Sequence, residues 1–115
     1  MNFLEKTIPE LQELMNSGAL SSLRLTFGYL GRIHDKNQQL RAVIQTNPLA
    51  IAIAVQRDLE RRHGHIRGPL HGIPVIVKDN IATRDLMQTT AGSLALTVIY
   101  TDTGWRVVTV TVEAP

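Results

Sequence analysis

Apolar residues along the first part of the chain recur at the three- and four-residue spacing of amphipathic helices. The first such segment has four of them: Ile8, Leu11, Leu14 and Met15. Thr7 and Glu10 fit a capping box at its start, and Gly18 can end it in a left-handed conformation. The pattern therefore predicts a helix over about residues 8–16.

A second helical pattern follows, which Ser21 or Ser22 can cap. Its apolar face consists of Leu23, Phe27, Leu30 and Ile33. Gly28 and Gly31 lie inside this helix, and each weakens it by about 1 kcal/mol relative to alanine. Either tertiary packing supplies the difference, or a glycine lets a neighbouring element approach closely.

The third predicted helix begins at Asn47 and Pro48, a favourable cap followed by a favourable first residue. It extends to about His63, with Gly64 as its stop. Its first half, "LAIAIAV", is apolar on all sides, so we expect it to be buried.

Short segments on either side of the third helix have the texture of strands. "RAVIQTN", residues 41–47, is one, and the run Ile73 to Val77 is another, with Pro74 near its start where proline is tolerated. The second run is apolar on both faces of the pleat, as in α/β proteins whose sheets are covered on both sides. From Thr97 onward strict alternation predicts a β-hairpin, with residues 102–104 as its turn.

Composition narrows the class of protein. The chain has 115 residues, enough for one domain, with 43% hydrophobic and 19% charged residues. Its net charge of +2 is too small to indicate a nucleic-acid partner, and the absence of cysteine excludes disulfides and thiolate nucleophiles. No apolar run is long enough to cross a bilayer, and the N-terminus lacks a secretory h-region, so we expect a cytoplasmic protein without a membrane partner.

The first chemical candidate is Lys78, which ends the apolar strand. A lysine held at a dry strand end has a lowered pKa and can act as a general base, whereas an exposed lysine merely closes the strand. Without cysteine, such a base would need a serine, a threonine or water to deprotonate. Ser93, in the loop "TTAGS", is a candidate hydroxyl partner, although a loop serine commonly bonds its own backbone.

Histidine and arginine cluster around the turn before this strand. His63, His65 and His71 could in principle bind zinc, but their spacing matches no helical metal motif, so we expect surface histidines and no metal or other cofactor. Arg61 and its neighbours in "RRHGHIR" favour a solvated helix end over a phosphate site.

Residues 68–96, "GPLHGIPVIVKDNIATRDLMQTTAGSLAL", closely resemble the amidase signature family, and a weaker likeness extends upstream to about residue 5. The resemblance implies an α/β fold in which a mixed sheet has helices on both faces. It also implies a hydrolase that cleaves amide C–N bonds with a Ser–Ser–Lys triad. Lys78 matches the lysine of that triad, and Thr89 to Ser93 match a loop near the catalytic core that has no triad role.

The chain departs from the family pattern in one respect. Both triad serines of the family belong to a Gly-Gly-Ser-Ser-Gly-Gly-like run after the lysine motif, and this sequence has no such run. We therefore expect residues 1–96 to be an incomplete N-terminal part of an amidase domain, and residues 97–115 to be a divergent, hairpin-like tail.

Three functional hypotheses follow from this departure. The chain is an amidase fragment that is inactive alone and meets a small amide substrate only when its site is completed. Alternatively, it is an interaction or regulatory module that pairs with a copy of itself or another chain through open sheet edges. The third hypothesis is a minimal hydrolase that uses Lys78 with Ser93.

Overall fold

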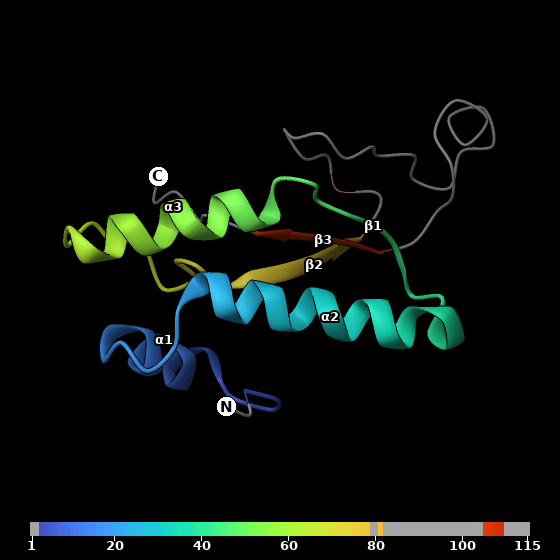
Figure 1. The fold of residues 1–115 in the computed structure, drawn as a ribbon, viewed down its shortest axis with the longest axis horizontal. Helices are drawn as coiled ribbons and strands as arrows, with labels where there is room; N and C mark the ends of the chain where they lie inside the picture. Colours follow the sequence, from blue (N-terminus) through green and yellow to red (C-terminus); the bar gives the residue numbers. More distant parts are fainter. Residues whose placement is uncertain (1–2, 79–80, 82–104, 110–115) are drawn as a thin grey trace.

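The computed structural model describes residues 3–78, residue 81 and the backbone of residues 105–109. It contains three helices, α1 (Ile8–Asn16), α2 (Ser22–Leu40) and α3 (Ala50–Arg62). Three strands accompany them, β1 (Val43–Thr46), β2 (Pro74–Lys78) and β3 (Trp105–Thr109) (Figure 1). Ser93 and residues 97–104, the first strand and turn of the expected hairpin, lie outside the described residues.

Local sequence signals fix the helix ends. The capping box at α1 is confirmed, because the Thr7 hydroxyl accepts the Glu10 N–H at 3.3 Å while the Glu10 carboxylate accepts the Thr7 N–H at 2.7 Å. Ser21 caps α2 by accepting the N–H of Arg24 at 3.1 Å. The left-handed glycine Gly18, with φ +81°, follows α1 as predicted.

The third helix begins later than the sequence indicated. Its first residue is Ala50 rather than Pro48, because Asn47 forms a turn of its own before the helix. The Asn47 side-chain Oδ1 accepts the N–H of Leu49, and the Asn47 backbone carbonyl accepts the N–H of Ala50, both at 3.0 Å. Asn47 therefore stabilises that turn and does not cap α3.

The strands form a mixed sheet in the order β1-β3-β2. β1 runs parallel to β3, and β2 runs antiparallel to it, with Pro74 opposite Thr109 and Lys78 opposite Trp105. β3 therefore joins the two strands that the sequence pattern had predicted on either side of α3. A mixed sheet agrees with the fold class expected from the sequence.

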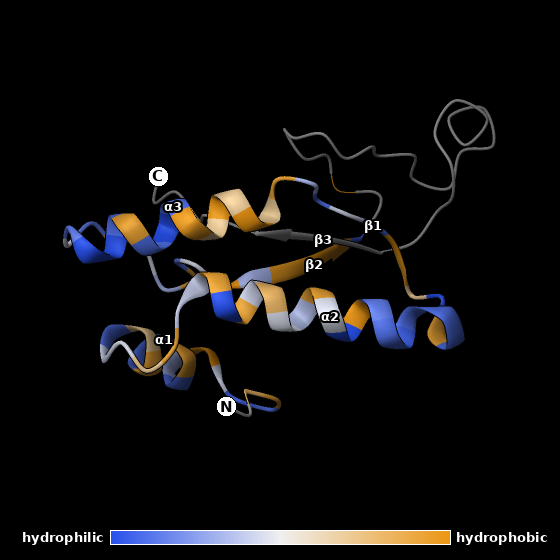
Figure 2. Ribbon diagram, viewed as in Figure 1, coloured by the Kyte–Doolittle hydropathy of each residue, from blue (hydrophilic) through white to orange (hydrophobic). Residues whose placement is uncertain are grey.

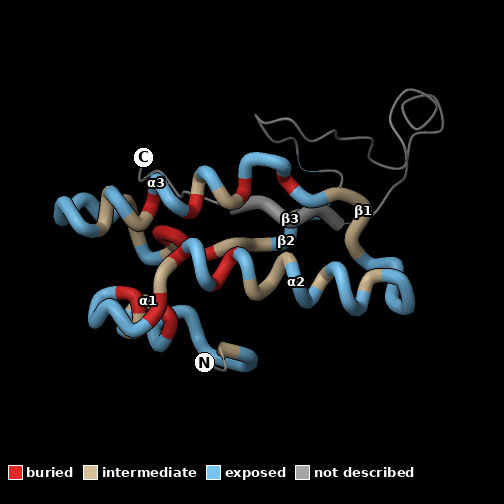
Figure 3. Tube along the Cα trace, in the orientation of Figure 1, coloured by how far each residue is buried: buried red, intermediate tan, exposed pale blue. Residues whose placement is uncertain are grey.

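The core lies where α1, the first turns of α2 and the start of β2 meet, as the distribution of buried positions in Figure 3 shows. It comprises Leu11, Met15, Leu20, Leu25 and Ile73. Within α2, Gly28 allows the close approach that its presence suggested: a Cβ there would lie 2.2 Å from the Phe3 ring. An added Cβ at Gly31 would meet no described atom within 4 Å outside the backbone of its own helix.

Burial of the apolar segments is less complete than the sequence predicted. Figure 2 shows α3 hydrophobic at its start and hydrophilic at its end, yet Val55 in its apolar half is 40% exposed. In β2, Ile76 is 51% exposed, so the described residues do not cover both faces of this strand. Among the described residues, no helix is both long and apolar enough to span a membrane.

Candidate functional site

Lys78 is the last residue of β2, as the apolar run predicted. Its carbonyl accepts the N–H of Ile81 at 3.0 Å. Its side chain is exposed. The dry strand end that would favour a neutral lysine is therefore not formed by the described part of the chain.

The turn that leads into β2 is the most densely bonded part of the site. We call residues 68–73 the β2 root. His71, expected at the surface, is instead 1% exposed. Its Nδ1 accepts the N–H of Arg67 at 3.1 Å, and its Nε2 donates to the carbonyl of Arg57 at 2.9 Å. Burial lowers the pKa of His71, since the interior disfavours the imidazolium.

Arg61 links the β2 root to two helices, which corrects the expectation that it is solvated. Its Nη2 donates to Gln12 Oε1 at 2.6 Å and to the carbonyl of His71 at 3.1 Å. Gln12 in turn donates to the carbonyls of Pro69, at 2.8 Å, and His71, at 3.1 Å. α1, α3 and the β2 root are thus joined through one amide and one guanidinium.

Glu60 is the anionic centre of the same region. It accepts from Arg57 at 3.1 Å and from Arg67 at 3.1 and 2.7 Å. The hydrogen bond from Arg67 holds the pKa of the Glu60 carboxyl below its ordinary value. The sequence shows these charges but not that Arg57, on an otherwise exposed-looking stretch, is buried against them.

The start of α2 completes the attachment of the β2 root. The Ser22 hydroxyl donates to the carbonyl of Gly72 at 2.6 Å, so this serine does more than mark a helix start. Asp58 of α3 accepts the N–H groups of Ser22 and Leu23 at 2.7 and 3.0 Å, which places a negative charge at the positive end of α2.

Gly72 occupies a position where only glycine fits without strain. Its φ is +76°, and an added Cβ would lie 3.1 Å from both side-chain atoms of Ser22. The hydrogen bond between Ser22 and Gly72 is therefore favoured by the absence of a side chain on glycine.

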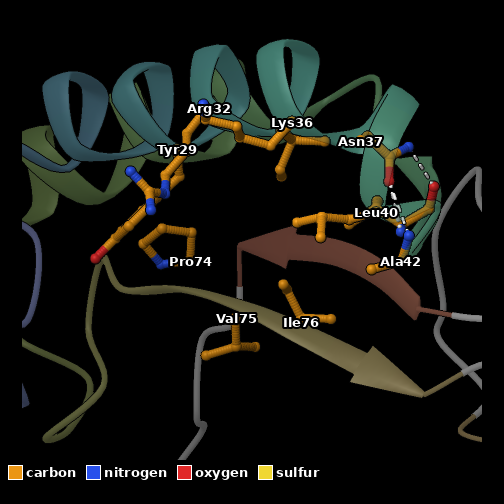
Figure 4. Close-up of a pocket in the computed structure, with 11 residues that line it drawn as sticks. Tyr29, Arg32, Lys36, Asn37, Leu40, Ala42, Pro74, Val75 and Ile76 are labelled. Carbon is orange, nitrogen blue, oxygen red and sulfur yellow. Dashed lines mark hydrogen bonds between the residues drawn. The ribbon is translucent and has the colours of Figure 1, made fainter.

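The histidines expected to lie at the surface form no metal site among the described residues. His63 and His65 are exposed, and no three potential metal-ligating side chains converge within the part of the chain that the structure describes. A groove of about 420 Å³ lies between the second half of α2 and the start of β2 (Figure 4). Arg32, Lys36 and Ile76 help to line it, and Asn37 closes one end by bonding Ala42 and Val43.

A model of the family described as Amidase matches residues 24–111 of the chain. The chain belongs to the amidase family. The match extends beyond residue 96, where the motif resemblance ends, into the segment that forms β3.

Relatives support this assignment over most of the chain. It is 50% identical over 92 residues to a protein of Schizosaccharomyces pombe that is named as an amidase, covering 80% of this chain and 16% of that protein. It is 37% identical over 91 residues to one subunit of the glutamyl-tRNA(Gln) amidotransferase of Chloroflexus aurantiacus, covering 78% and 18% of the two chains.

A solved amidase structure has the same fold. The peptide amidase of Stenotrophomonas maltophilia superposes with a TM-score of 0.77 and 49% identity, over 81% of this chain and 20% of that one. The chain thus spans about a fifth or less of the length of these amidase-family relatives.

Proposed function

We propose that this chain supplies the lysine of an amidase-type hydrolytic site, with Lys78 as the base of a Ser–Ser–Lys triad. The observation that carries the proposal is the place of Lys78 at the end of β2, in a motif that matches the family's triad lysine. The β2 root supports the proposal, since its bonds to α1, α2 and α3 fix the strand that carries the lysine.

In the proposed reaction, neutral Lys78 accepts a proton from a bridging serine. That serine deprotonates the nucleophilic serine, which attacks the amide carbonyl. Backbone N–H groups stabilise the tetrahedral oxyanion. The C–N bond then breaks, the amine leaves with the transferred proton, and water releases the acid from the acyl-enzyme. The serines are not supplied by a Gly-Gly-Ser-Ser-Gly-Gly-like run here, because the sequence has none. We therefore propose that the 115 residues alone are inactive.

A chimera tests the role of Lys78. Residues 5–96 would replace the matching part of the peptide amidase of Stenotrophomonas maltophilia, and hydrolysis of a peptide amide and of a simple aryl amide would be measured. We expect activity from the chimera and a loss of about 10²- to 10⁴-fold with Lys78→Ala, as for removal of a general base. Lys36→Ala, which removes an exposed lysine on α2, is the matched control and should retain activity.

Equal activity of the chimera with and without Lys78 would refute the triad role. The 115-residue chain is assayed in parallel. Turnover by it that disappears with Lys78→Ala would instead favour the minimal hydrolase with Ser93 as the hydroxyl partner.

The second candidate function is an interaction module. Among the described strands, β1 and β2 each pair only with β3, so each has one edge without a described partner, and Ile76 is exposed on β2. Open edges of this kind pair with other chains. Sedimentation of the purified chain would show self-association if a second copy pairs there, and a monomer at high concentration would count against that partner.

A further inference from the structure

His71 has the strictest hydrogen-bonding requirement of the histidines in the described part of the chain. Its ring is buried between α3 and the β2 root. The Arg67 N–H can only donate, so Nδ1 must accept, and the Arg57 carbonyl can only accept, so Nε2 must donate. The neutral imidazole with its proton on Nε2 is the form that satisfies both partners.

Protonation of this ring would put a second N–H on Nδ1, facing the N–H of Arg67. One hydrogen bond would be lost and two donors would oppose each other in a buried site. The imidazolium would also stand near Arg57 and Arg61, two cations from α3 that disfavour it.

One nearby carboxylate could oppose this effect, since Glu60 Oε2 lies 4.0 Å from Nδ1. Its oxygens already accept from Arg57 and Arg67. Asp58, the other acid of this part of α3, is bound to the start of α2. From α1 and α2 the groups bonded to the root are the neutral side chains Gln12 and Ser22.

We infer that His71 is a pH-sensitive lock: its neutral ring holds the β2 root against α3, and its protonation releases the root and loosens β2. The inference concerns the fold and holds whether or not Lys78 acts as a base.

The sign of the pH dependence follows from proton linkage. The released state binds the proton near the ordinary histidine pKa of 6.5, whereas the pKa of His71 in the locked state is lower. The lock is therefore fully effective above pH 6.5 and weakens as the pH falls toward the lower value. Above about pH 5 the Glu60 carboxyl stays ionised, because its pKa is lowered from the ordinary value of 4.5, so its protonation does not contribute there.

The test is amide hydrogen exchange of the 115-residue chain between about pH 7.5 and about pH 5, corrected for the intrinsic pH dependence of exchange. We expect amides of the β2 root and of β2 to lose protection by up to about tenfold per pH unit below 6.5. His71→Gln keeps one acceptor and one donor but cannot be protonated, so its protection should not change with pH. His34→Gln, at an exposed histidine of α2, is the control and should behave like the unmodified chain.

Nitrogen-15 spectra of the histidine rings give a second measurement that needs no variant. They should show the Nε2–H tautomer for His71 at about pH 7.5, with a titration that follows the loss of protection. Protection that does not change with pH in the unmodified chain, or that changes equally in His71→Gln, would overturn the inference. So would a His71 ring that is protonated while the β2 root remains protected.

Discussion

The two ends of β2 differ sharply in how they are held. At the β2 root, His71, Gly72 and Ile73 are all buried, and side chains from three helices bond to the backbone of the turn. At the β2 tip, residues 76–78, Ile76 and Lys78 are exposed. One short strand therefore joins a buried, hydrogen-bonded turn to an end with exposed side chains.

The residues that anchor β2 and the residue with a proposed chemical role thus lie at opposite ends of a five-residue strand. The side-chain hydrogen bonds that anchor the β2 root are made before the strand begins, by residues without a proposed role in the reaction, and β2 itself pairs with β3. Lys78, the residue with the proposed role, lies at the other end of the strand, where its side chain is exposed and its backbone lies opposite Trp105 of β3.

The two ends should differ most in stability when one isoleucine is shortened in the β2 root and one in the β2 tip. Ile73 is 5% exposed and belongs to the core, so Ile73→Ala should lower the free energy of unfolding by about 2 to 5 kcal/mol. Ile76→Ala, at the half-exposed position, should cost less than about 1 kcal/mol. Urea denaturation followed by circular dichroism measures both. Similar losses for the two variants would show that the β2 tip is packed as well as the root.

The second test compares an alanine substitution at Gly72 in the β2 root with one at Gly31 in the middle of α2. Gly72→Ala should destabilise the chain by about 1 to 3 kcal/mol, because alanine is strained at φ +76° and its Cβ would press on Ser22. Gly31→Ala is the matched control in open space on α2 and should stabilise the chain by about 1 kcal/mol. Opposite shifts of the thermal midpoint are expected. A shift of the same sign in both variants would contradict the tight fit at Gly72.

The helices and the strand segments could be predicted from local signals, since β3 lies within the second strand of the expected hairpin, but the position of β3 between β1 and β2 could not. The capping box, Ser21 and Gly18 act within a few residues, so the bounds of α1 and the start of α2 were correct. The lysine at the end of β2 was equally readable, because an apolar run with proline near its start ends there. Membership of the amidase family followed from the motif around it and is confirmed by the family match.

The lock at the β2 root could not be predicted, since its partners are far apart in sequence. His71 lies 59 residues from Gln12 and 14 from Arg57, so spacing within the histidine cluster indicated nothing of its burial. Ser22 was understood as a helix start, although its hydroxyl bonds Gly72, 50 residues away. One usable signal was Gly72 itself, because a glycine between histidine and an apolar strand often marks a close approach of backbone.

Substitution of Lys78 at the β2 tip should change the stability of the fold least. Because the side chain is exposed, Lys78→Ala should change the free energy of unfolding by less than about 0.5 kcal/mol. Lys36→Ala, at an exposed lysine of α2, should behave alike in the same urea titration. A loss of more than about 1 kcal/mol for Lys78→Ala alone would mean that the lysine helps to hold the sheet, and would weaken its assignment as a base. Near-neutral stability, together with lost activity in the chimera, would instead place the function of Lys78 in the reaction and not in the fold. A catalytic side chain needs a rigid support but need not itself stabilise the fold. Lys78 would meet both conditions, because it ends a strand that the β2 root anchors.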